Sequence, residues 1–269
     1  MVEGPQRIVM SINTGVRYAV SGRPGAVYID VPAEIINAPV EREDVYFPAA
    51  IGDPPRPQGD PRAVEEALRV LRTAERPLMI IGKGTVWSWA EDELQEFVDK
   101  VQMPFLTSAM GMVRTDHPMC VAGARSQAIK NADVMLLIGA RFNWILHFGL
   151  PPRFARGVKV IQIDITAEEI GRNVPAPVGI IGDAKIVLAQ LNAAWNGNPV
   201  THDEADWIPI CASMPQKIRR RFSRCWTPTR CPYAIIAAIA RSGISFPRIL
   251  SSSPMAPAHG HLAPGCQFV

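Results

Sequence analysis

Between residues 60 and 200, short apolar segments alternate with amphipathic segments, and this alternation constrains the fold most. The apolar segments hold three to six residues rich in Ile, Leu and Val, which is typical of strands that are buried on both faces. Such strands, separated by helices, form a parallel sheet that helices cover on both sides. The sequence therefore predicts the α/β class with a doubly wound parallel sheet. The predicted strands are residues 77–82, 104–106, 134–139, 159–164 and 178–182.

Helix signals precede and separate these strands. Asp60 suits an N-cap and Pro61 suits the first helical position, while Val64, Leu68 and Leu71 follow on one face. The remaining predicted helices are residues 91–101, 126–131 and 184–195.

The rest of the chain is organised differently. Residues 1–32 predict a helix (6–20), a turn (21–25) and a strand (26–31), which together cannot bury their apolar faces. We interpret them as the end of a domain whose beginning is missing. Residues 33–59 are rich in proline and predict a linker. The central α/β domain is expected at 60–200, a helical linker at 201–225 and a separate tail at 226–269.

Composition excludes several classes of function. The formal net charge of +3 gives nucleic-acid binding no electrostatic support. No apolar run reaches the roughly 18 residues that span a bilayer. The 5 cysteines have no regular spacing, which favours free thiols in an intracellular compartment.

Polar side chains follow the carboxyl ends of the predicted strands, where open parallel sheets bind ligands. Lys83 and Arg141 supply cations for a phosphate, and Asp164 could accept from a ribose hydroxyl. Glycines at 82, 84, 139 and 182 would let the backbone approach a ligand. A glycine after a strand is more often only a turn, but four such features at one edge favour a nucleotide-like site. The chain has no Gly-x-Gly-x-x-Gly and no Walker motif.

Several segments match a known family. Gly-Arg-Pro-Gly at 22–25 resembles the end of the pyrimidine-binding domain of thiamine-diphosphate enzymes. The run Asn-Trp-Ile-Leu-His-Phe-Gly-Leu-Pro-Pro at 143–152 resembles, more specifically, the 2-hydroxyacyl-CoA lyase and oxalyl-CoA decarboxylase branch. Residues 81–84, 110–118 and 161–165 support the same branch, and the resemblance covers about residues 4–225.

The resemblance implies a function and a set of residues. Enzymes of this branch bind thiamine diphosphate and Mg²⁺ between an N-terminal and a C-terminal domain, and they cleave or decarboxylate an acyl-CoA. Their central domain is Rossmann-like and binds no thiamine diphosphate, but in oxalyl-CoA decarboxylase it holds an activating ADP. The matching ADP-site residues here are Arg23, Lys83, Arg141, Asp164 and, by its main chain, Ala184. A loop that approaches the acyl-CoA matches Ser108, Ala109, Met110 and Gly111.

Other parts of the family pattern are missing. The glutamate that activates the cofactor should lie well before the Gly-Arg-Pro-Gly turn, where this chain has 21 residues, and the Gly-Asp-Gly motif that carries Mg²⁺ does not occur. We therefore assign no catalytic residue and no metal ligand. We therefore expect this chain to be a fragment of such an enzyme. We expect the isolated fragment to be catalytically inactive and to self-associate only weakly. The resemblance places it in the cytoplasm or in peroxisomes.

Two other interpretations stay open. The chain could be a stand-alone ADP-binding or CoA-binding regulatory module, or an inert truncated product. Residues 226–269 contain no Asp, Glu or Lys and do not resemble the family. We expect this tail to be disordered and to derive from an out-of-frame, unspliced or alternative-exon reading; the alternative is an isoform-specific tail that binds a partner.

Overall fold

The computed structural model describes residues 1–107, 113 and 117–197. The predicted loop from Ser108 to Gly111, the helical linker and the tail lie outside the described residues. The described residues all belong to one compact unit. No described helix is both long enough and apolar enough to cross a membrane.

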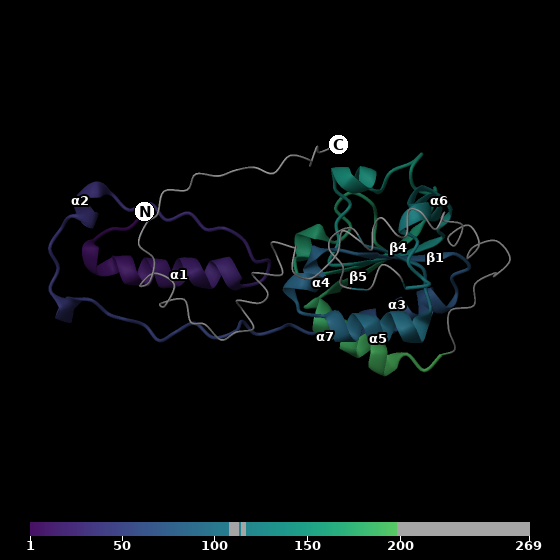
Figure 1. Cartoon of the computed structure of the whole chain (residues 1–269), viewed down its shortest axis with the longest axis horizontal. Coiled ribbons are helices and arrows are strands. Elements are labelled where there is room, and N and C mark those ends of the chain that lie inside the picture. Colours follow the sequence, from purple (N-terminus) through teal and green to yellow (C-terminus); the bar gives the residue numbers. More distant parts are fainter. Residues whose placement is uncertain (108–112, 114–116, 198–269) are drawn as a thin grey trace, which may run out of the picture. The chain divides into compact units, whose positions relative to one another are not determined.

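A five-stranded parallel sheet forms the centre of the domain (Figure 1). Its strand order is β2-β1-β3-β4-β5, so the chain moves outward in one direction from β1 to β2 and then in the other direction from β3 onward. The predicted doubly wound parallel sheet is confirmed, with strand ends within about one residue of expectation. The strands are β1 (Pro77–Ile81), β2 (Phe105–Thr107), β3 (Val134–Ile138), β4 (Lys159–Asp164) and β5 (Val178–Ile181).

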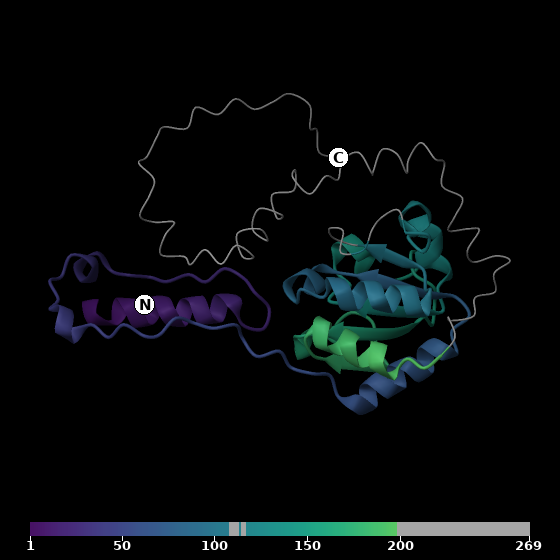
Figure 2. The ribbon, with the colours of Figure 1, turned by 60° about the horizontal axis from the view of Figure 1, so that its bottom comes forward.

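Helices cover both faces of this sheet (Figures 1 and 2). One face packs against α3 (Pro61–Arg72), α5 (Glu91–Val101) and α7 (Ala184–Ala194), which bury their apolar stripes in one core cluster. The opposite face packs against α6 (Arg125–Asn131) and the segment after β3, which form a second cluster. Alternate strand residues point to opposite faces, so Met79 belongs to the first cluster and Ile80 to the second. The sheet is therefore buried on both sides.

Two helices begin at acidic caps. The Asp60 side chain accepts a hydrogen bond from the Arg62 amide at 2.9 Å and begins α3, as the sequence predicts. Asp183 accepts from the Lys185 amide at 3.0 Å and begins α7. Both caps satisfy amide groups that lack a partner inside the helix.

The N-terminal segment differs from expectation in its strand. Its helices are η1 (Pro5–Arg7), α1 (Ile8–Val20), α2 (Ala33–Ile36) and η2 (Arg42–Asp44), the last two inside the predicted linker. Residues 26–31 form no strand, so that prediction is wrong. Ile29 packs against Gly15 of α1 instead, and Val2 donates to the Asp30 carbonyl at 2.9 Å. A strand requires a neighbouring strand to pair with, and none is present beside residues 26–31 in the described part of the chain.

A short helix, α4 (Lys83–Trp87), begins after Gly82, which follows β1. Three short 3₁₀ segments complete the described elements: η3 (Ala122–Ala124), η4 (Trp144–Gly149) and η5 (Ala167–Glu169).

Candidate functional site

A cavity of about 280 Å³ opens at the carboxyl edge of the sheet. Segments that follow β1, β3, β4 and β5 line it, together with parts of the turn at 22–24 and the proline-rich segment at 54–56. The chain reverses its direction of winding between β1 and β3, and ligands of open α/β sheets bind at such a reversal. The topology thus places the cavity where this fold forms binding sites.

The five residues predicted for a nucleotide site all line this cavity. Lys83 follows β1, Arg141 follows β3, Asp164 ends β4 and Ala184 begins α7, while Arg23 comes from the turn after α1. The other predicted set, Ser108 to Gly111, lies outside the described residues.

Three glycines at this edge bring two backbone segments close together. A Cβ on Gly84 would lie 2.6 Å from the Gly139 Cα, and a Cβ on Gly82 would collide with the Gly139 carbonyl. Gly139 also has a φ of +57°, a region that favours glycine. These three glycines therefore permit the backbones after β1 and β3 to touch each other, and Gly84 and Gly139 also line the cavity.

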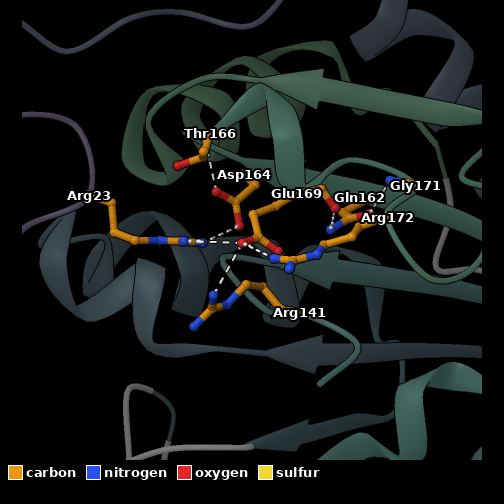
Figure 3. Close-up of polar contacts among 8 residues, drawn as sticks. All are labelled: Arg23, Arg141, Gln162, Asp164, Thr166, Glu169, Gly171 and Arg172. Atoms are coloured by element: carbon orange, nitrogen blue, oxygen red, sulfur yellow. Dashed lines mark hydrogen bonds and ion pairs between the residues drawn. The ribbon is translucent and has the colours of Figure 1, made fainter. Parts of the chain in front are cut away.

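A carboxylate that sequence reasoning missed lies beside the cavity. The Oε1 atom of Glu169 accepts hydrogen bonds from Arg23 and Arg141 at 3.1 Å each and from Arg172 at 3.2 Å. Figure 3 shows the three guanidinium groups approaching Glu169 from three sides. Arg23 Nη2 also lies 3.9 Å from Asp164 Oδ2. No local sequence signal marks Glu169, which follows β4 by five residues and does not come directly after the strand.

The pKa values of Asp164 and Glu169 are shifted in opposite directions. Burial raises the pKa of Asp164, and the Thr166 amide and Arg23 offset this effect only in part. Burial also tends to raise the pKa of Glu169, but hydrogen bonds from Arg23 and Arg141 outweigh it and hold that pKa below its usual range. Glu169 therefore stays a firmly ionised partner of the arginines.

A second ion pair borders the cavity. Arg56 Nη1 donates to Asp183 and to the Ser88 carbonyl, at 3.1 Å and 2.5 Å. Sequence reasoning missed Arg56 because it lies in the segment interpreted as a linker. Lys83 is exposed, and its side chain has no hydrogen bond or ion pair with the described residues.

The charges of the lining side chains favour an anion. Arg23, Arg56, Lys83 and Arg141 supply four positive charges, and Asp164 and Asp183 supply two negative ones. The excess of two positive charges suits a group with two or more negative charges, such as a diphosphate. In the described segments, no cluster of three or more His, Cys, Asp or Glu side chains could hold a metal ion.

Comparison with known proteins agrees with the sequence motifs. Residues 64–191 match the family model for the thiamine pyrophosphate enzyme, central domain. The 2-hydroxyacyl-CoA lyase 1 of Mus musculus is 45% identical over 190 residues, which are 70% of this chain and 33% of that protein. Oxalyl-CoA decarboxylase of Escherichia coli (strain K12) is 40% identical over 204 residues, which are 74% of this chain and 36% of that protein. The chain thus spans about a third of the length of these relatives.

A solved structure shares the fold. Benzoylformate decarboxylase from Polynucleobacter necessarius superposes with a TM-score of 0.59 at 16% identity, over 74% of this chain and 38% of that one. The predicted resemblance to the 2-hydroxyacyl-CoA lyase and oxalyl-CoA decarboxylase branch is confirmed. Residues 64–191 thus form a domain of the family described as the thiamine pyrophosphate enzyme, central domain.

Proposed function

We propose that this chain binds an adenine nucleotide of the ADP type in the cavity at the carboxyl edge of its sheet. One observation carries the proposal: Lys83, Arg141 and Asp164 follow three different strands, yet they line one cavity together with Arg23. The side chains that line this cavity carry a formal excess of two positive charges. This excess favours a negatively charged diphosphate over an uncharged ligand.

Each residue has a role that its chemistry supports. Arg23 and Arg141 donate charge-assisted hydrogen bonds to phosphate oxygens, and the exposed ammonium of Lys83 adds a further cation. Asp164 accepts from a ribose hydroxyl. The main-chain amide of Ala184, at the first position of α7, donates to a phosphate oxygen.

The cavity also offers an apolar surface for the base. Trp87 lines it and is half-exposed, and Pro54 and Pro55 line it as well. An indole ring with a free face can stack on adenine. A ligand that combines phosphates with an aromatic base therefore uses both kinds of lining.

The whole enzyme is proposed by similarity. Relatives are named 2-hydroxyacyl-CoA lyase and oxalyl-CoA decarboxylase, and we propose carbon–carbon bond cleavage of an acyl-CoA with thiamine diphosphate and Mg²⁺ as the reaction to which this domain contributes. Residues 60–200 would serve as the nucleotide-binding domain, and Ser108 to Gly111 would approach the acyl-CoA. The proposed location is intracellular, in the cytoplasm or in peroxisomes.

The chain by itself is proposed to have no lyase or decarboxylase activity, because its sequence lacks the Gly-Asp-Gly motif and none of its described residues is assigned a catalytic role. An assay of the purified chain with thiamine diphosphate, Mg²⁺ and a 2-hydroxyacyl-CoA or oxalyl-CoA tests this. Turnover above the no-protein background would overturn it.

Calorimetric titration tests the nucleotide site directly. ADP is expected to bind with an affinity that falls as salt concentration rises, because charged groups carry the contact. Adenosine, which lacks phosphates, should bind far more weakly, and CoA in place of ADP tests the alternative of a CoA-binding module. Equal affinity for ADP and adenosine, or no binding of ADP, would contradict the proposal.

A further inference from the structure

We propose that Glu169 is the positioning residue of this site: it holds the guanidinium groups of Arg23 and Arg141 in the orientation that receives phosphate. This inference rests on the proposed nucleotide site. The observation behind it is that three guanidinium groups from separate segments donate to one carboxylate oxygen, Glu169 Oε1, at 3.1 to 3.2 Å.

Glu169 belongs to the rigid part of the domain. The buried side chain of Gln162, in the middle of β4, donates to the Glu169 carbonyl at 2.9 Å and accepts from the Gly171 amide at 3.0 Å. These two bonds fasten the turn that carries Glu169 to the sheet. The Glu169 side chain is only 7% exposed, so its carboxylate has little room to change position.

The arginines are the adaptable partners. The side chains of Arg23, Arg141 and Arg172 are 40%, 45% and 63% exposed, and long exposed side chains sample many rotamers unless something holds them. Among the described residues, Glu169 is the one carboxylate that forms an ion pair with Arg141. The fixed carboxylate therefore orders the arginines, and not the reverse.

Holding an arginine in this way leaves most of its donors available. A guanidinium group has five N–H donors, and the bond to Glu169 comes from Nη1 in each of the three cases. Arg23 and Arg141 also line the cavity, whereas Glu169 does not. An anion in the cavity would thus meet the remaining donors on a side that the carboxylate does not occupy.

Glu169 could instead compete with phosphate for the same cations. To compete in this way, the Glu169 carboxylate would have to move away from the arginines when the ligand binds. The hydrogen bonds of Gln162 to this turn and the burial of the carboxylate oppose such a movement. Positioning and competition predict opposite results when the charge is removed: positioning predicts weaker phosphate binding, and competition predicts tighter binding.

The test compares Glu169→Gln and Glu169→Asp with Glu168→Gln, which alters the exposed neighbouring carboxylate. Outer residues that orient binding groups typically contribute about 10-fold to 100-fold to affinity in metal sites, and we expect roughly a 10-fold loss of ADP affinity in both Glu169 variants. Asp keeps the negative charge, but its side chain is too short to reach the arginines. The Glu169→Asp variant therefore tests the position of the carboxylate separately from its charge. Adenosine affinity in all variants and ADP affinity in Glu168→Gln should stay unchanged.

A second readout needs no ligand. In ¹⁵N NMR spectra of the arginine side chains, slow rotation of the Arg23 and Arg141 guanidinium groups is expected in the wild type and is expected to be lost in Glu169→Gln. Unchanged or tighter ADP binding in Glu169→Gln would overturn the inference. If the wild type binds no ADP, the proposed function fails, and arginine spectra that are identical in wild type and variant would still refute the positioning role.

Discussion

The carboxylate of Asp183 accepts from Arg56 Nη1 at 3.1 and 3.2 Å, although 127 residues separate the two in the chain. The same carboxylate accepts from the Lys185 amide and begins α7. Arg56 Nη1 also donates to the Ser88 carbonyl, beyond α4. One carboxylate thus joins the proline-rich segment to the start of the last described helix, at the edge of the cavity.

Replacing Asp183 with Ala should destabilise the domain. The variant loses the helix cap and leaves Arg56 without its carboxylate, so the free energy of unfolding should fall by about 1–3 kcal/mol. Chemical denaturation measures this. Asp60→Ala is the matched control, because Asp60 also caps a helix but is exposed and has no ion pair in the described part of the chain. Its loss should be about 1 kcal/mol, and a loss as large as that of Asp183→Ala would argue against the role of the ion pair.

Replacing Arg141 with Ala should weaken ADP binding. The lost charge-assisted contact corresponds to roughly 1.5–3 kcal/mol, which is about 10-fold to 150-fold in affinity. Calorimetric titration of the variant measures the change, and Arg153→Ala controls for the loss of one positive charge, because Arg153 is exposed and does not line the cavity. Unchanged ADP affinity in Arg141→Ala would remove this residue from the proposed site.

Replacing Trp87 with Ala should weaken binding of the base but not of the phosphates. Base stacking on an aromatic ring contributes about 1–3 kcal/mol, so ADP affinity should fall while pyrophosphate affinity stays the same. Trp144→Ala is the control, since Trp144 is more exposed than Trp87 and does not line the cavity. An equal loss for ADP and pyrophosphate would show that the substitution distorts the whole cavity.

The raised pKa of Asp164 predicts a pH effect on stability. Because burial raises this pKa above that of the unfolded chain, the folded state binds the proton more tightly. The stability that Asp164 contributes is therefore full below the unfolded pKa and is lost as pH rises through the folded pKa. Asp164→Asn, which keeps an acceptor oxygen for the Thr166 amide, should unfold at higher denaturant concentration than the wild type at neutral pH.

This difference should shrink as the pH falls toward the unfolded pKa. Glu169→Gln should change stability in the opposite direction. The pKa of Glu169 is lowered in the folded state, so the stability that its carboxylate contributes is lost on acidification. Unfolding curves across the acidic range measure both variants. Parallel pH profiles for wild type and Asp164→Asn would contradict the assigned pKa direction.

The sequence by itself determined the class of fold and most of the helices and strands. The sheet strands are short runs of buried apolar residues, and the helix starting at Pro61 is marked by its own cap, so neighbours along the chain carry the information. It also placed Lys83, Arg141 and Asp164 at one edge, because parallel strands end on the same side of a sheet.

Only the tertiary structure decided what depends on residues distant in sequence. Residues 26–31 have the composition of a strand, but no strand lies beside them within the described ranges. Arg56 has the sequence context of a linker, and only the folded chain places it against Asp183. Arg23 and Glu169 lie 146 residues apart, and no local periodicity relates them. Local patterns report which backbone a segment prefers, whereas ion pairs and close backbone contacts arise only once the strands and helices have packed.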